Sequence, residues 1–327
     1  MLTPPDDLAV DDLADALRSG WGIRPGSLAY AAVGFGSHHW TTTDRSGREW
    51  FVTADRAGSG GTEIGVLSAA LTTTLRLNHL GLEFIVPPVT TRSGSVLQRV
   101  DGYAVTLYPH LDEFAGKPPD LIKLIARLHE ATPAARTYAP IDDFVIPDRD
   151  AVTGSTGVAA TGSADAGSSD TSPSGIGPYA ARFQQLLADH RPAVTAAFDQ
   201  YDSRVQNRRT DRRSWVITHG EPKQDNVMIT ATGPVLIDWE TLRLAPPARD
   251  LWMFGGPSDI EEYTRMTGHP VVPDDLDLFA LRWDLADLSS FASWFVRPHQ
   301  ETPELEIAWQ ACVDICENRL GNHLNRS

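Results

Sequence analysis

Four polar residues of the types that carry catalysis lie close together in the chain: His219, Glu221, Asn226 and Asp238. Transfer of a phosphoryl group from a nucleotide needs one carboxylate near the acceptor hydroxyl, together with an amide and a second carboxylate that hold Mg²⁺. The types and spacing of these residues therefore indicate phosphoryl-transfer chemistry.

Short apolar segments around these residues predict the elements that position them. The loop THGEPKQDN carries the first acid and the amide, and the apolar residues after Asn226 begin a strand. Thr232 and Gly233 form a turn into a second strand, VLID, which ends on Asp238. We therefore expect a small hairpin with polar side chains converging at one end.

Three motifs in this region resemble those of a known enzyme family. HGEPKQDN resembles the H-G-D-x-x-x-x-N catalytic loop of aminoglycoside phosphotransferases, including the spectinomycin type, which is similar to the protein-kinase catalytic loop. IDWE resembles the family's metal loop, and PARDLW resembles the P-x-x-D-L sequence after it. The resemblance implies an α+β, bilobal, protein-kinase-like fold with a small β-rich N-lobe and a larger, mostly helical C-lobe. It also implies phosphorylation of a small-molecule hydroxyl, with ATP or GTP as the co-substrate.

The resemblance also implies roles for individual residues. Glu221 would be the catalytic base, and Asn226 and Asp238 would be the Mg²⁺ ligands. His219 and Asp250 would brace the loop.

Two further features of the loop bear on this assignment. The base position holds a glutamate where the family usually has an aspartate, so the carboxylate of Glu221 reaches about one methylene further. Lys223 stands two positions after it, where protein kinases carry a lysine that can contact the transferred phosphate.

The N-terminal region predicts a hairpin-rich sheet. Three segments rich in β-branched and aromatic residues, AYAAV, HHWTTT and EWFVTAD, are separated by two turns. The first turn is glycine-rich, and in a kinase-like N-lobe it would lie over the triphosphate. Its glycines would let backbone N–H groups approach phosphate oxygens. The residues of this turn are Gly34, Phe35, Gly36 and Ser37.

One expected cation is missing from this region. Kinase-like enzymes carry a lysine on the third strand to hold the α- and β-phosphates, and the chain has Thr53 at that position. The nearest cations are Arg48 and Arg56. Either backbone N–H groups, Thr53, an arginine and Mg²⁺ hold the phosphates, or the protein is a pseudokinase that binds nucleotide without transferring phosphate.

Further elements complete the predicted N-lobe, which spans residues 1–110. Thr62–Leu80 has apolar residues at helical spacing, and Glu63 lies in its first turn. The segments FIVPPV, SVLQRV and YAVTLYPHL alternate like strands. The last resembles the hinge between kinase lobes, where His110 and Leu111 would meet the nucleotide base. Residues 111–327 would form the C-lobe.

Length and composition fit a protein with two substantial cores. The chain has 327 residues, 41% of them hydrophobic. It has no apolar run of the roughly 20 residues that cross a bilayer, and its N-terminus lacks the features of a signal peptide. Cys312 and Cys316 are best interpreted as reduced thiols, which favours a cytoplasmic location. We expect no membrane partner and a monomer or weak dimer.

The charge of the chain bears on its ligands. The net charge of −15 disfavours nucleic acid as a partner and is compatible with a cationic small molecule. Acidic residues gather after the hairpin, and Asp284 and Asp287 lie beside Trp283 at helical spacing. These three residues could form an acid-rimmed aromatic wall for an amino-sugar or aminocyclitol antibiotic. Solvated helix faces are the alternative explanation.

A low-complexity segment and two alternative functions remain. Ala151–Gly177 consists almost entirely of small and polar residues, so we expect a flexible insertion within the C-lobe. Related folds phosphorylate choline, sugars and macrolides, and the hairpin does not distinguish these acceptors. A metal hydrolase built on His219, Glu221 and Asp238 is a further alternative, although it lacks a second clear histidine ligand nearby.

Overall fold

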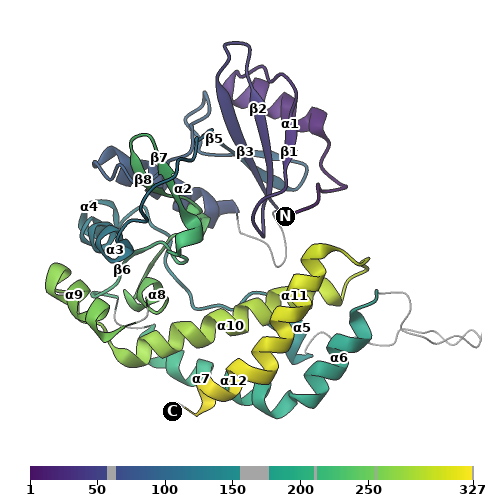
Figure 1. The fold of residues 1–327 in the computed structure, drawn as a ribbon, viewed down its shortest axis with the longest axis vertical. Helices are drawn as coiled ribbons and strands as arrows, with labels where there is room; N and C mark the ends of the chain where they lie inside the picture. Colours follow the sequence, from purple (N-terminus) through teal and green to yellow (C-terminus); the bar gives the residue numbers. More distant parts are fainter. Residues whose placement is uncertain (57–63, 155–176, 210–211, 255, 326–327) are drawn as a thin grey trace, which may run out of the picture. The chain divides into compact units, whose positions relative to one another are not determined.

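The computed structural model describes residues 1–56, 64–154, 177–209, 212–254 and 256–325. Within these residues the chain forms two compact units. The first comprises Met1–Asp142 with Arg212–Asp275, and the second comprises Asp143–Asp211 with Leu276–Ser327. Helices and strands are both abundant, which confirms the predicted α+β class (Figure 1). The division into an N-lobe and a C-lobe near residue 110 stays a prediction.

The first unit contains a five-stranded antiparallel sheet in the order β1-β2-β3-β5-β4. Its strands are β1 (Ala29–Ala31), β2 (His38–Thr43), β3 (Glu49–Arg56), β4 (Gln98–Val100) and β5 (Tyr103–Pro109). The first three strands fall where aromatic and β-branched residues predicted them. Because side chains alternate between the faces of a sheet, each strand contributes residues to two different environments.

One face of the sheet packs against the N-terminal helical segment. This segment consists of α1 (Val10–Ala16) and the π-helical turn η1 (Leu17–Trp21), and it covers the strands in Figure 1. Trp40, Val52 and Leu107 of the sheet lie in one buried cluster with apolar residues of this segment. That cluster fixes the orientation of β2 and β3.

The opposite face carries the polar residues of the central strands. His39 pairs with Thr53, and Thr53 pairs with Thr106, so these three residues form a row across β2, β3 and β5. Helix α2 (Ile64–His79) contributes Leu67 and Leu71 to a second apolar cluster, which includes Ala104 of β5.

Two predictions for this region need correction. The segment FIVPPV is not a strand and makes only an isolated bridge between Ile85 and Leu236. Its two adjacent prolines lack N–H donors and cannot sustain a ladder. The helix predicted over Thr62–Leu80 is described as Ile64–His79, and both Thr62 and Glu63 lie outside the described residues.

The rest of the first unit holds the predicted hairpin and the helices around it. The hairpin pairs β7 (Val227–Thr230) with β8 (Gly233–Leu236), and β6 (Val216–Thr218) pairs with β9 (Arg243–Ala245). Short 3-10 turns precede and follow the hairpin: η2 (Gln224–Asn226) and η3 (Trp239–Thr241). The helices are α3 (Leu121–Glu130), α4 (Thr132–Ala135), α8 (Ala248–Leu251) and α9 (Pro257–Thr267).

Helices make up the second unit. They are α5 (Arg149–Thr153), α6 (Ala180–Asp189), α7 (Arg191–Arg208), α10 (Pro273–Phe295), which begins in the first unit, α11 (Pro303–Asp314), the π-helical turn η4 (Ile315–Arg319) and α12 (Leu320–Leu324). Helices α6 and α7 are consecutive in the chain, and Pro192 lies in the first turn of the second helix. Residues 151–153 of the predicted flexible insertion belong to α5. Residues 155–176 lie outside the described part, so the rest of this prediction is not tested.

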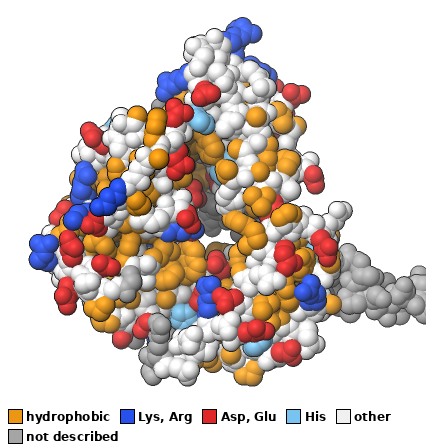
Figure 2. Space-filling view, in the orientation of Figure 1, with side chains coloured by type: hydrophobic (Ala, Val, Ile, Leu, Met, Phe, Trp, Pro, Cys, Tyr) orange, Lys and Arg blue, Asp and Glu red, His pale blue; other side chains and the backbone are white. Residues whose placement is uncertain are grey.

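The charge imbalance of the sequence is visible on the molecular surface. Asp and Glu side chains are scattered over the face drawn in Figure 2 and do not form a single patch. No described helix combines the length and apolar character needed to span a membrane.

Candidate active site

The hairpin brings the two predicted metal ligands to its open end. Val227 pairs with Leu236, and the next backbone contact is a 2.9 Å hydrogen bond from Ile237 N to Asn226 O. Asp238 follows directly. The side-chain amide of Asn226 donates from Nδ2 to the backbone oxygen of Glu221 at 2.8 Å. This bond orients the amide and leaves its oxygen as the atom suited to a metal.

His219 connects the two halves of this arrangement. Its Nε2–H donates to Ile237 O at 2.7 Å, and its Nδ1 accepts from the backbone N–H of Glu221 at 3.2 Å. The side chain is fully buried, and burial lowers the pKa of His219 to about 4. The ring is therefore neutral at pH 7, and both of its nitrogens are used to position the loop.

Asp250 holds the loop in place through its carboxylate. Its carboxylate accepts hydrogen bonds from the backbone N–H of His219 at 2.9 Å and of Gly220 at 2.6 Å. His129 of α3 lies 3.0 Å from the same carboxylate and also contacts Tyr263 of α9. Burial raises the pKa of Asp250, but the hydrogen bond and charge of His129 outweigh it, so the net pKa is lowered. Sequence reasoning missed the role of His129.

The predicted catalytic base forms an ion pair with its neighbour. The ammonium group of Lys223 donates to a carboxylate oxygen of Glu221, and both side chains are accessible to solvent. Backbone bonds from Lys223 N to Glu221 O and from Asn226 N to Lys223 O close the loop tightly. The acid, the amide and the lysine are therefore held within one compact turn.

A cavity of about 180 Å³ lies next to this turn. Apolar side chains from the sheet, from α2 and from the hairpin form one part of its lining: Phe51, Leu67, Leu71, Val86, Met228 and Ile237. The remaining lining residues are Ser37, His39, Thr53, Asp55, Tyr108, Pro109, His110, Leu111, Asp238, Trp239 and Glu240. An apolar slot that continues into a polar end suits a ligand with a flat ring and a charged tail.

The cavity collects several residues that the sequence predicted to bind nucleotide. These are Ser37, Thr53, His110 and Leu111, together with the metal ligand Asp238. The other residues of the glycine-rich turn, Gly34, Phe35 and Gly36, are absent from the lining. Both glycines adopt positive φ angles, 68° and 91°, so this turn depends on residues without a Cβ atom.

Sequence reasoning missed other lining residues. Phe51 and Asp55 flank Thr53 at alternate positions of β3, and His39 of β2 follows Ser37, which directly precedes that strand, at the same spacing. The period of two along each strand was the available signal.

Three carboxylates crowd the polar end of the cavity. Burial raises the pKa of Asp55 to about 6, against the lowering effect of a hydrogen bond from Ser37, and the charge of Asp238 adds to the rise. Burial and the charge of Glu221 raise the pKa of Asp238, and burial with Asp238 and Asp55 raises that of Glu240. Clustered carboxylates with raised pKa values favour a bound cation.

The residues at this end fit Mg²⁺. The ion prefers hard oxygen ligands, and Asp238 and Asn226 supply a carboxylate and an amide oxygen. Asp238 also has a left-handed backbone, with φ 66° and ψ 59°, which is unusual for a residue with a Cβ atom. Such conformations often occur at functional sites, because the surrounding structure must hold them in place.

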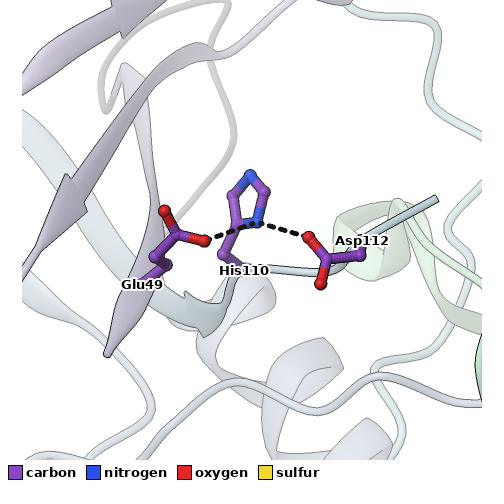
Figure 3. A group of neighbouring side chains, drawn as sticks. All are labelled: Glu49, His110 and Asp112. Atoms are coloured by element: carbon purple, nitrogen blue, oxygen red, sulfur yellow. Dashed lines mark ion pairs between the residues drawn. The ribbon is translucent and has the colours of Figure 1, made fainter. Parts of the chain in front are cut away.

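A smaller cluster lies at the predicted hinge, beside the cavity (Figure 3). His110 Nδ1 lies 3.9 Å from Glu49 Oε2 and 4.0 Å from Asp112 Oδ1, and the three side chains converge on one point. The two carboxylates are largely exposed, with 61% and 78% of each side chain accessible. Of the three residues, His110 lines the cavity.

The predicted acceptor residues lie on α10. Asp284 is buried, and its carboxylate contacts Arg319 at 3.1 Å and His323 at 2.7 Å. These contacts give Asp284 a structural role in the second unit and occupy both of its oxygens. Trp283 and Asp287 are half-buried on the same helix. An acceptor role for the three residues stays a prediction.

Comparison with known proteins identifies the enzyme class. Residues 118–267 match the sequence model of the phosphotransferase enzyme family, and this match includes the hairpin, the loop around Glu221 and the His129–Asp250 anchor. This part of the chain is similar to that family. The protein is a small-molecule phosphotransferase that acts on a hydroxyl group.

The relatives of this phosphotransferase include one curated protein and several solved structures. Protein StrN of Streptomyces griseus is 29% identical over 274 residues, which cover 75% of this chain and 76% of StrN. A spectinomycin phosphotransferase in complex with ADP and spectinomycin is similar with a TM-score of 0.67 and 15% identity, covering 97% and 98% of the two chains. The choline kinase LicA from Streptococcus pneumoniae has a TM-score of 0.54 and 12% identity, covering 97% and 99%. These structures confirm the protein-kinase-like fold.

Proposed function

We propose that the phosphotransferase transfers the γ-phosphoryl group of ATP or GTP to a hydroxyl of a cationic aminoglycoside or aminocyclitol. The observation that carries this proposal is that the predicted hinge, the predicted metal ligand Asp238 and the Glu221–Asn226 loop meet in one unit. The hinge residues and Asp238 line the same cavity. The loop is hydrogen-bonded to the end of the strand before Asp238.

Each part of the cavity has a role in this proposal. The nucleobase would lie in the apolar slot, near the backbone of His110 and Leu111, and the phosphates would extend toward the glycine-rich turn and Asp238. Asn226 and Asp238 would hold Mg²⁺, which when bound neutralises charge on the β- and γ-phosphates. The raised pKa values of the cavity carboxylates support this location for a cation.

The residues of the loop would carry the transfer to the acceptor. The carboxylate of Glu221 would accept or orient the proton of the attacking hydroxyl, and Lys223 would stabilise the transferred phosphoryl group. His219 and Asp250 would act through position alone, because their polar atoms are already hydrogen-bonded within the loop.

Two observations bear on the acceptor class. The net charge of −15 attracts cations, and the similar structures include enzymes named for spectinomycin and for choline. Both observations favour a small acceptor that carries positive charge. Kinases for sugars or macrolides share the same chemistry, so the acceptor must be found by direct comparison.

A panel of acceptors tests the proposal. Purified protein would be incubated with ATP or GTP and Mg²⁺, together with aminoglycosides, aminocyclitols, choline, neutral sugars and a macrolide, and nucleoside diphosphate release would be followed. We expect release to depend on a cationic acceptor and on Mg²⁺. Turnover with a neutral sugar or macrolide alone would refute the acceptor class. Diphosphate release at the same rate with and without every acceptor would indicate hydrolysis and would contradict transfer to a member of this panel.

A further inference from the structure

The cavity has few positive groups with which to bind a triphosphate. Three carboxylates line its polar end, whereas none of the described lining residues is a lysine or an arginine. A nucleotide tail carries several negative charges, so Mg²⁺ and hydrogen-bond donors of the protein must offset this repulsion. The question is which side chain provides a donor in place of the strand lysine.

The nearest cationic side chains have other partners. Arg56 of β3 points away from the cavity, where its guanidinium donates to both carboxylate oxygens of Asp7 at 2.7 Å. Lys223 is paired with Glu221 in the catalytic loop. Neither group lines the cavity. Among the described side chains that line the cavity, the candidate donors are therefore neutral residues of the sheet.

His39 has the required position. It lines the cavity from β2, and its ring stacks on Phe51 with 5.0 Å between the centroids and 27° between the planes. Its Nδ1 lies 3.4 Å from the hydroxyl of Thr53, the residue at the lysine position. On the other side of the ring, a Cβ atom built on Gly34 would lie 3.6 Å from Nε2. The imidazole thus bridges the lysine position and the glycine-rich turn.

The protonation of the ring decides what it can offer. Burial lowers the pKa of His39 to about 4, so the imidazole is neutral at pH 7 and carries one N–H. When the hydroxyl of Thr53 donates to Nδ1, that single proton resides on Nε2. The N–H then faces the glycine-rich turn.

We infer that His39 is a phosphate-binding residue of this enzyme, with Thr53 fixing its tautomer so that Nε2–H donates to an α- or β-phosphate oxygen. This inference rests on the proposed nucleotide site. A neutral donor suits this cavity, because it adds a hydrogen bond to the phosphate without needing a charge that burial disfavours.

Comparing two ligands separates phosphate binding from packing against the base. His39→Phe keeps an aromatic ring on Phe51 and removes the donor. Calorimetry should show ADP with Mg²⁺ binding about 10- to 100-fold more weakly than to wild type. Adenosine, which lacks phosphates, should bind with nearly unchanged affinity.

His38→Phe is the matched control. His38 is the neighbouring residue on β2, also buried, but its Nδ1 lies 3.1 Å from the hydroxyl of Tyr30, outside the cavity. The same substitution there should leave both affinities unchanged. Circular dichroism would confirm that each variant is folded. His39→Gln is a smaller change that retains a hydrogen-bond donor, so it should lose less ADP affinity than His39→Phe.

A restoring substitution makes the test stricter. Thr53→Lys in the His39→Phe background places a cation at the lysine position and should recover most of the lost ADP affinity. If His39→Phe weakens ADP and adenosine binding equally, His39 packs against the base and does not bind phosphate. Unchanged ADP binding would also overturn the inference. Failure of the wild-type protein to bind any nucleotide would instead refute the proposed function.

Discussion

Asp55 offers a quantitative test of the electrostatics of the cavity. The side chain is 7% exposed, and its pKa is raised from 3.8 to about 6, chiefly by burial. A carboxyl group whose pKa is raised on folding favours the folded state when protonated. That contribution is complete below pH 3.8 and is lost as the pH rises through 6. Above pH 6 the folded protein must therefore carry an unfavourable buried charge.

Asp55→Asn removes this charge and keeps the size of the side chain and an acceptor for Ser37. A pKa difference of about 2.2 units, from 3.8 to about 6, corresponds to about 3 kcal/mol. The variant should therefore be more stable than wild type by about 3 kcal/mol at pH 8 and by about half of that at pH 5. Urea denaturation at the two pH values, in buffer without divalent cations, measures the difference.

Asp225→Asn is the control for the chemical change. Asp225 is exposed in the η2 turn, so its substitution should alter the free energy of unfolding by less than about 0.5 kcal/mol at either pH. A stability gain for Asp55→Asn that is absent, or that is the same at pH 5 and pH 8, would show that Asp55 is not held at a raised pKa. The argument for a cation near Asp238 would then lose its electrostatic support.

Three further outcomes follow from the site. Asp250→Asn places an amide against two backbone N–H donors, so urea denaturation should show a free energy of unfolding lower by about 3–5 kcal/mol. A loss below about 1 kcal/mol would contradict the anchoring role of Asp250. Glu221→Gln should lower kcat by about 10²- to 10⁴-fold, with Glu221→Asp retaining more activity, and equal turnover of all three would move proton acceptance to another group. For a cationic acceptor, KM should rise with added salt, because salt screens the attraction between the acceptor and the carboxylates over about 8 Å at physiological ionic strength. A salt-independent KM would argue against attraction by surface carboxylates.

Local sequence patterns predicted the catalytic hairpin well. Val227–Thr230 and Gly233–Leu236 form the strands, and the polar residues at their open end meet as expected. These contacts are short-range, so the turn residues and the apolar alternation were sufficient to place them. The three N-terminal strands were predictable for the same reason.

Local sequence patterns did not predict the long-range contacts. His129 meets Asp250 from 121 positions away, and nothing in α3 distinguishes this histidine from one on an ordinary helix face. Asp284 is a second example, because its spacing did not predict that Arg319 and His323 of a distant helical segment pair with its carboxylate. Its acceptor role stays a prediction. Charge spacing alone does not reveal which acids find partners in the folded protein.

The fate of the phosphoryl group tests the central claim most directly. Mass spectrometry of the acceptor, after incubation with Mg²⁺ and ATP or GTP, should show the gain of one phosphoryl group with the wild-type protein. Asp238→Asn should yield no such product while remaining folded, because an amide cannot offset the charge of a metal ion that bridges the phosphates. A folded Asp238→Asn variant that phosphorylates the acceptor at a near wild-type rate would contradict the account.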